Sequence, residues 1–349
     1  MRLPNTLRRM GHMTSRAEWP TLAEHLPDIR TAIDGASHIA CIAHKDADAD
    51  SLGSALAVTL ALRNAGKRVD AIVPEPMPRG LAHLPGIDTV LVAREDVEQH
   101  HYDLVLTFDC PTLARFGDKQ DIVSSAPMSI VFDHHVSNDN FGKLHVVEVT
   151  ASATGQIAAA LLQGLGYPIT PEIADNLYAA LFTDTGGFRH ENTTYDALAL
   201  GAELVGLGAN APLIALKSYK SRTLPQVLLT ARVLDGLQHD ERKTLFWSSV
   251  TSTMMDDLHA DLQDAEGIID ELQSIDTMEL AVLFKEVSPT LTRVSVRSRH
   301  PHDAAALCGG FGGGGHRRAA GAEIPLSLSD AREAFLAAAK QLMAKALTE

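Results

Sequence analysis

The sequence predicts an α/β protein: a mostly parallel sheet in an N-terminal domain, a helical linker, and a smaller mixed α/β C-terminal domain, with a cleft between the domains. Three observations indicate this class. Short apolar runs alternate with helical patterns in the first half, the middle is helical, and strand patterns return in the last third. Such alternation is typical of parallel sheets that are covered by helices.

The first half supplies four predicted strands, which are short apolar runs bounded by polar or turn residues. They cover residues 38–43, 68–73, 103–108 and 129–132. Residues 52–65 have the apolar spacing of a helix. In sheets of this kind, ligands bind beyond the carboxyl ends of the strands. The residues that follow these runs are therefore the first candidates for function.

The rest of the chain divides into a helical middle and a second set of strands. Helical patterns cover residues 153–164, 171–183, 195–208 and 224–237. Strands return at 244–250, 278–284 and 291–298, before a short helix near Asp303, a glycine-rich turn and a long helix over 329–347. We therefore expect a flexible tail over 1–18, a catalytic metal-binding domain over 19–208, a linker over 209–224 and a substrate-binding domain over 225–349.

Composition and charge limit the class of protein. Hydrophobic residues make up 45% of the 349 residues and no run of about 18 apolar residues occurs, which predicts a globular protein without a membrane partner. The first 13 residues lack the apolar stretch of a secretion signal, and Met13 is an alternative start. Three widely spaced cysteines without a CxxC motif favour a reducing, cytoplasmic location. The net charge of −14 disfavours binding of long duplex nucleic acid.

Four clusters of metal-binding residue types follow or end the predicted elements. Taken singly, each has an ordinary explanation, such as a solvated acidic loop, a helix cap or a surface histidine pair. Carboxylates with imidazoles suit Mn²⁺, whereas purely carboxylate sites suit Mg²⁺. The clusters are His44, Asp48 and Asp50; Asp109; Asp133, His134 and His135; and Asp184.

Taken together, the four clusters predict a pair of divalent ions. Two ions ~3.5–4 Å apart need several ligands and a shared carboxylate. Asp184 supports this interpretation, because it ends an otherwise apolar helix, where a charge needs a partner or a metal. Two such metal ions activate a bridging water and hold a phosphoryl group in position. The sequence thus indicates hydrolysis of phosphate esters.

A glycine-rich stretch in the last third predicts a second, anion-binding place. Consecutive glycines let backbone N–H groups approach an anion closely, and basic side chains add positive charge. A flexible loop is the alternative interpretation, and no Walker lysine follows the glycines. The candidates are Gly314, Gly315 and His316, with Arg297 and Arg299 from the strand upstream.

These clusters resemble the four motifs of the DHH phosphoesterase superfamily in order and residue type. The stretch 311–321 is similar to the glycine-rich motif of the DHH-associated C-terminal domain, subtype 1. The resemblance covers about residues 37–347, and the stretches 133–142 and 183–189 most resemble the nano-RNase and 3′-phosphoadenosine-5′-phosphate phosphatase group. Many relatives have a proline before the first aspartate, where this chain has Ala47, and we expect only a local loop difference there.

The resemblance implies a role for each of these residues. His44, Asp48 and Asp109 would hold one Mn²⁺ ion, and Asp50, Asp109, His134 and Asp184 would hold the other, with Mg²⁺ as the alternative metal. Asp133 would orient a neighbouring histidine, and His135 would contact the scissile phosphate and protonate the leaving group. Substrate phosphate would be bound by Arg297, Arg299, Gly314, Gly315 and His316, together with Arg115.

The substrates that the resemblance implies are short. Long-strand exonucleases of the superfamily carry an additional oligonucleotide-binding barrel, for which this chain has no room. The expected substrates are short oligonucleotides, linear dinucleotides such as pGpG or pApA, and 3′-phosphoadenosine-5′-phosphate. A cyclic-dinucleotide phosphodiesterase, a single-strand exonuclease and a non-catalytic nucleotide sensor are the alternatives. Members often form homodimers, but no pattern in this sequence identifies an interface.

Overall fold

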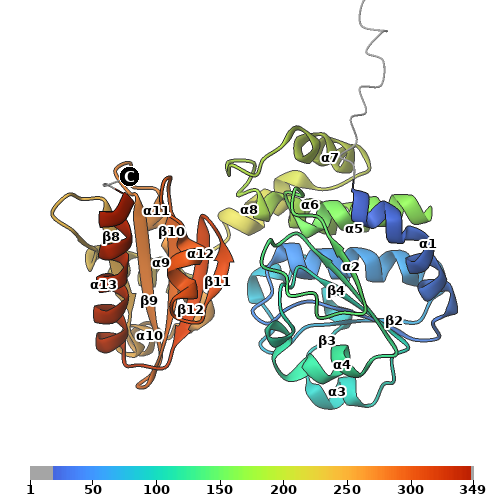
Figure 1. Ribbon diagram of the computed structural model, residues 1–349, viewed down its shortest axis with the longest axis horizontal. Coiled ribbons are helices and arrows are strands. Elements are labelled where there is room, and N and C mark those ends of the chain that lie inside the picture. Colours follow the sequence, from blue (N-terminus) through green and yellow to red (C-terminus); the bar gives the residue numbers. More distant parts are fainter. Residues whose placement is uncertain (1–18, 347–349) are drawn as a thin grey trace, which may run out of the picture. The chain divides into compact units, whose positions relative to one another are not determined.

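The computed structural model describes residues 19–346, and the predicted tail over residues 1–18 lies outside them. The chain divides into two compact units between Lys220 and Ser221 (Figure 1). The segment 209–224, expected as a linker, contains helix α8 (Ala211–Tyr219). Each unit has its own sheet and its own hydrophobic core.

The sheet of the first unit has six strands in the order β3-β2-β1-β4-β5-β6, and its pairings are parallel. Strands β1 and β4 are buried along their whole length, as parallel strands with helices on both faces must be. The predicted α/β class is confirmed. The strands are β1 (Ile39–Ile42), β2 (Val69–Ile72), β3 (Val90–Leu91), β4 (Leu104–Phe108), β5 (Met128–Asp133) and β6 (Leu144–Val147).

Helices cover both faces of this sheet. Figure 1 shows α1, α2, α5 and α6 on one face and α3 and α4 on the other. Helix α2 packs closely on α6, because a Cβ atom on Gly53 would lie only 2.7 Å from the carbonyl oxygen of Asn176. The helices are α1 (Pro20–Gly35), α2 (Ala49–Asn64), α3 (Arg94–Glu98), α4 (Gln120–Ser125), α5 (Thr154–Leu165), α6 (Pro171–Asp184) and α7 (Tyr195–Gly206).

Two features of the first unit differ from the sequence-based expectation. Helix α2 begins three residues before the predicted start, because the Asp48 carboxylate accepts a hydrogen bond from the Ser51 N–H at 3.0 Å and caps it. The edge strands β3 and β6 were not predicted. Both are short and only partly buried, so they lack the continuous apolar run of the inner strands.

The second unit has a mixed sheet in the order β11-β12-β10-β9-β8-β7, in which only the β8–β9 pairing is parallel among the described strands. One apolar core lies under α12 and α13, and another lies under α9 and α11. The strands are β7 (Gln238–His239), β8 (Leu245–Val250), β9 (Leu280–Ser288), β10 (Leu291–Ser298), β11 (Gly314–His316) and β12 (Ala319–Ile324). The helices are α9 (Leu224–Asp235), α10 (Ser252–Leu258), α11 (Ile268–Gln273), α12 (Ala304–Gly309) and α13 (Leu328–Ala346).

The glycine-rich segment, predicted as a turn, also forms strand β11, which pairs with β12. A Cβ atom on Gly313 would collide with the carbonyl oxygen of Gly321, so the chain can approach β12 there only through a glycine.

Within residues 19–346, no single helix has the length and apolar character to cross a membrane. Helices α7 and α8 pass that test of length and composition only as a pair bent by 118°.

Candidate active site

The first-unit residues that the sequence singled out meet at the carboxyl edge of the parallel sheet. His44 follows β1, Asp109 follows β4, and Asp133 ends β5; these three strands are neighbours in the sheet. Asp48 and Asp50 lie at the start of α2, and Asp184 is the last residue of α6. Positions far apart in the chain therefore supply one site.

One group of donor atoms comprises His44, Asp48 and Asp109. Nε2 of His44 lies 4.0 Å from Oδ1 of Asp48 and 3.6 Å from Oδ2 of Asp109. The other ring nitrogen of His44, Nδ1, lies 2.8 Å from the carbonyl oxygen of Lys45. This contact points Nε2 at the two carboxylates, as a metal-binding imidazole requires.

A second group comprises Asp50, His134 and Asp184, and it also includes Asp109. Nε2 of His134 lies 3.3 Å from Oδ1 of Asp109, 3.7 Å from Oδ2 of Asp184 and 3.8 Å from Oδ2 of Asp50. Nδ1 of His134 lies 3.0 Å from the carbonyl oxygen of Ala151. The two carboxylate oxygens of Asp109 thus face different groups, which is the arrangement of a carboxylate shared between two cations.

The start of helix α5 holds two of these carboxylates. The backbone N–H groups of Thr154 and Gly155 donate to Asp50 at 2.7 and 2.8 Å, and the Thr154 hydroxyl donates to Asp109 at 3.0 Å. Unpaired N–H groups and the helix dipole favour negative charge at a helix N-terminus. Asp109 itself has φ of +60°, a left-handed conformation that aspartate tolerates better than most residues.

Asp133 is fully buried and organises the histidine pair. Its Oδ1 accepts hydrogen bonds from the backbone N–H groups of His134 and His135 at 2.8 and 3.2 Å, and lies 2.7 Å from Nδ1 of His135. Its Oδ2 accepts a hydrogen bond from Nδ2 of Asn138 at 2.5 Å. The carboxylate therefore fixes the ring of His135 next to Asp109, whose Oδ1 is 3.6 Å away.

Crowded carboxylates and burial change the acidity of the site. Burial raises the pKa of Asp50 well above its usual range, and the charges of Asp109 and Asp184 raise it further. Burial likewise raises the pKa of Asp184 to about 7, against the opposing effect of His134. Burial disfavours ionised Asp109 too, but hydrogen bonds with His134 and His44 hold its pKa well below the usual value.

These carboxylates bring more negative charge into the buried site than the neighbouring histidines balance. Like charges in a buried site cannot all ionise unless a cation compensates them. Carboxylate oxygens and imidazole nitrogens are ligands of divalent ions, and each of the two groups places three donors within 4.8 Å of one another. The residues present therefore fit two divalent cations.

Neighbouring carboxylates oppose the effect of burial on the pKa values of His134 and His135. Burial alone would lower the pKa of His134, but the hydrogen bond with Asp109 and nearby carboxylate charges raise it well above the usual value. Burial would also lower the pKa of His135, but the hydrogen bond with Asp133 and the charge of Asp109 raise it. The contact with Asp133 therefore favours the protonated form of the His135 ring.

The sequence predicted a phosphate-binding role for Arg115, and the structure places it beside His44. Its Nη2 lies 3.1 Å from Nδ1 of His44, and its backbone carbonyl accepts a hydrogen bond from the N–H of Lys45 at 2.7 Å. Arg115 therefore brings a guanidinium to the rim of the first donor group.

Most of the predicted phosphate-binding residues of the second unit lie on β10 and β11, which flank β12 on its two sides. Arg297 pairs with Ala319 of β12, and Ala319 pairs with His316 of β11, so Arg297 and His316 share one row of the sheet, about 10 Å apart. Nε of Arg297 donates to Asp270 at 3.0 Å. The structure does not bring Arg299 into this row: it follows β10 and donates to the backbone carbonyls of Gln273 and Asp276.

Sequence reasoning gave no role to several residues that hold the site. Thr154 and Gly155 contact Asp50 across more than a hundred residues of chain, which no local pattern reveals. Asn138 lies in the stretch 133–142, whose resemblance to the family motif assigns no role to the asparagine. Asn192 donates to the backbone carbonyls of Ser152 and Asp184, and it fixes the end of α6.

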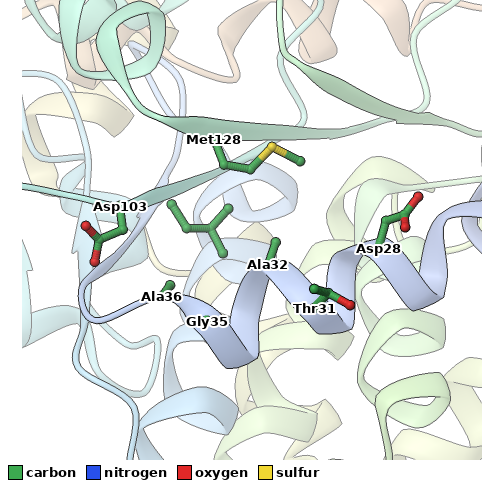
Figure 2. A pocket seen from close by; sticks show the side chains of 8 residues that line it. Asp28, Thr31, Ala32, Gly35, Ala36, Asp103 and Met128 are labelled. Atoms are coloured by element: carbon green, nitrogen blue, oxygen red, sulfur yellow. The ribbon is translucent and has the colours of Figure 1, made fainter.

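A hollow of about 350 Å³ lies elsewhere, beside α1 and the amino ends of β4 and β5. Figure 2 shows Asp103 and Met128 across from Thr31 and Ala32 of α1. Its lining is mostly apolar, with two carboxylates and the hydroxyl of Thr31, so the clustered donors at the carboxyl edge remain the candidate active site.

Comparison with known proteins identifies the family. The DHH family N-terminal domain matches residues 38–181, and the DHHA1 domain matches residues 248–345. The bifunctional oligoribonuclease and PAP phosphatase NrnA of Thermus thermophilus is 31% identical over 331 residues, which cover 91% of this chain and 94% of that protein. The chain belongs to the DHH family. The resemblance predicted from the motifs is thereby confirmed, including the DHHA1 domain.

Two other proteins are also similar to this chain. The NrnA protein of Bacillus subtilis is 27% identical over 289 residues, covering 80% of this chain and 87% of that protein. A crystal structure of an exopolyphosphatase-related protein from Bacteroides fragilis has the same fold, with a TM-score of 0.84 at 24% identity over 91% of this chain and 96% of that one. The predicted reaction class is confirmed: this DHH protein is a hydrolytic enzyme that acts on phosphoester bonds.

Proposed function

We propose that this enzyme uses two Mn²⁺ ions to hydrolyse short oligonucleotides, including linear dinucleotides such as pGpG and pApA, to mononucleotides, and 3′-phosphoadenosine-5′-phosphate to AMP. The observation that carries the proposal is the position of Asp109, whose two oxygens face two separate groups of donors. The names of the NrnA relatives support oligoribonucleotides and PAP as substrates, whereas the linear dinucleotides are those that the motif resemblance implies.

The proposed ligands follow from the two donor groups. His44, Asp48 and Asp109 would hold one ion, and Asp50, Asp109, His134 and Asp184 the other. When bound, such ions acidify a coordinated water and neutralise charge on the phosphoryl oxygens. Manganese is preferred over magnesium in the proposal because each group includes an imidazole nitrogen.

The chain's own residues would control the proton and the leaving group. The Asp133 carboxylate holds Nδ1 of His135 in one orientation, which leaves Nε2 for the substrate. Against the effect of burial, the hydrogen bond with Asp133 raises the pKa of His135 and so favours the ring form that can donate a proton to the departing oxygen. Arg115 would add a guanidinium for a phosphate oxygen beside His44.

In the second unit, the proposed role is to bind a terminal phosphate of the substrate. Backbone N–H groups of Gly314 and Gly315 and the side chains of His316 and Arg297 are the candidates, because β11 and β10 flank β12 on its two sides. Arg299 remains a candidate by resemblance, although its guanidinium binds backbone carbonyls.

A substrate panel ordered by length and end chemistry tests the proposal. The panel comprises pApA, pGpG, a five-nucleotide RNA, a 24-nucleotide RNA and 3′-phosphoadenosine-5′-phosphate, each with Mn²⁺ or Mg²⁺. We expect fast release of mononucleotides from the dinucleotides and AMP from the bisphosphate, with Mn²⁺ supporting the higher rate. Asp109→Asn serves as the inactive control.

Two results would contradict the proposal. Equal rates on the 24-nucleotide RNA and on dinucleotides would remove the preference for short substrates. No turnover of any substrate with Mn²⁺, while a nucleotide still binds, would instead indicate a nucleotide sensor.

A further inference from the structure

A second cluster of metal-binding side chains lies at the opposite, amino edge of the first sheet. His38 directly precedes β1, Asp70 is the second residue of β2, and His100 lies in the connection from α3 to β4. His38 and His44 stand at opposite ends of β1, which separates this cluster from the candidate active site by about 20 Å. No part of the proposed phosphoesterase mechanism uses these side chains.

One nitrogen of each histidine contacts the same oxygen of Asp70. Nε2 of His38 and Nδ1 of His100 each lie 2.8 Å from Oδ2 of Asp70. All three donor atoms lie within 4.8 Å of one another. Tetrahedral zinc with bonds of about 2.0–2.1 Å keeps its ligand atoms about 3.3 Å apart. Each of the two nitrogen–oxygen distances would therefore have to lengthen by only about half an ångström to admit an ion.

The surroundings hold these side chains in place without closing off the solvent. The ring of Tyr102 packs on His38, with ring centroids 4.6 Å apart, and its hydroxyl donates to Asp70 at 3.0 Å. The side chain of His38 is 6% exposed, that of Asp70 19% and that of His100 29%. His38 is thus buried, while Asp70 and His100 remain accessible to an entering ion.

We infer that His38, Asp70 and His100 form a binding site for a zinc-type divalent ion. Two imidazoles and one carboxylate suit Zn²⁺, and water would complete a tetrahedral set. Because the three residues come from β1, β2 and the segment before β4, such an ion would tie the amino ends of three adjacent strands together. Binding would displace the protons that now lie between the rings and Asp70, and would stabilise the folded first unit.

Counting zinc in the full-length protein tests this site. Protein stripped with a chelator is titrated with Zn²⁺ against a chromogenic competitor, for the natural chain and for His100→Asn. The candidate active site contributes equally to both, so we expect His100→Asn to bind one equivalent fewer. His101→Asn is the matched control, since His101 is the adjacent, exposed histidine, and it should bind as many equivalents as the natural chain.

A second measurement needs no substitution. In ¹⁵N spectra of the histidine side chains, Zn²⁺ should shift Nε2 of His38 and Nδ1 of His100. Equal zinc counts in a correctly folded His100→Asn protein, or unchanged signals from both rings at saturating Zn²⁺, would show that the cluster is only a hydrogen-bonded triad. Neither readout depends on turnover, so failure here leaves the proposed phosphoesterase function untouched.

Discussion

Nδ1 of His135 lies 2.7 Å from Oδ1 of Asp133, and Nδ2 of Asn138 donates to the other oxygen of the same carboxylate. Both oxygens of a fully buried aspartate are therefore engaged, and the ring of His135 has one orientation. Because Asn138 and Asp133 hold His135 in place, we expect their loss to lower the catalytic rate.

Asn138→Ala should lower kcat by about 10–100-fold, the usual cost of removing a group that orients a functional side chain. The Asp133 carboxylate would lose the donor to its Oδ2, and the carboxylate that orients His135 would be held less firmly. Because the substrate contacts are unchanged, KM should stay within a factor of about three. Steady-state kinetics on pApA measures both constants. Ser137→Ala, an exposed neighbour, is the control, and an equal kcat in the two variants would remove Asn138 from the mechanism.

Asp109→Asn should abolish activity and weaken metal binding. Loss of merely supporting groups costs about 10–100-fold, so loss of a ligand shared by both ions should exceed 100-fold. Asparagine is the right replacement because it tolerates the φ of +60° at this position, whereas most residues would add backbone strain. Manganese stoichiometry, activity and circular dichroism are measured together. Full activity in a variant that binds two ions would refute the shared-ligand assignment.

Gly53→Ala should destabilise the first unit by about 1–2 kcal/mol, although alanine normally favours a helix by about 1 kcal/mol. The new Cβ would lie 2.7 Å from the carbonyl oxygen of Asn176, a backbone atom that cannot swing away. Gly206→Ala in α7 is the matched control, because its Cβ would meet nothing within 4 Å. Urea unfolding measures the change in unfolding free energy for both variants, and we expect the two changes to have opposite signs. A stabilised Gly53→Ala protein would mean that α2 and α6 separate easily.

Asp240→Asn should make the stability of the second unit less sensitive to a fall in pH. Partial burial would raise the pKa of Asp240, but the backbone N–H groups of Leu245 and Thr244 donate to it and hold its pKa below the usual value. Such a group stabilises the fold above its unfolded pKa of about 3.9, and this stabilisation is lost as the pH falls through the lower folded pKa.

Urea unfolding at pH 7 and pH 2.5 tests this dependence. The natural chain should exceed Asp240→Asn in stability by about 1 kcal/mol at pH 7, and the difference should shrink at the acid value. The exposed Asp235→Asn should show no such change. A difference that grows in acid would contradict the direction of the pKa shift.

The sequence predicted the inner strands and the positions of the donor residues because both have local signatures. The runs that became β1, β4 and β5 are mainly apolar, and His44, Asp109 and Asp133 come where each run ends. The general rule that ligands bind at the carboxyl edge then indicated that these residues meet. Strand order did not follow from the sequence, since it depends on which strands pair.

What the sequence could not predict depends on contacts between distant segments. The bonds from Thr154 and Gly155 to Asp50 join the first turns of two helices, and neither helix start shows the other in its pattern. The row formed by Arg297, Ala319 and His316 requires the register of three strands. His38, Asp70 and His100 are unremarkable singly, because single histidines and aspartates are common beside strands.

The donors of the candidate active site also have an order in time. His44 leaves the ribosome first, whereas Asp184, the last residue of α6, follows 140 residues later, and α5 must already be folded to hold Asp50. A chain released before α6 is complete would carry several isolated metal-binding side chains but only one of the two donor groups. Tight uptake of a second ion would therefore report that synthesis has passed the end of α6.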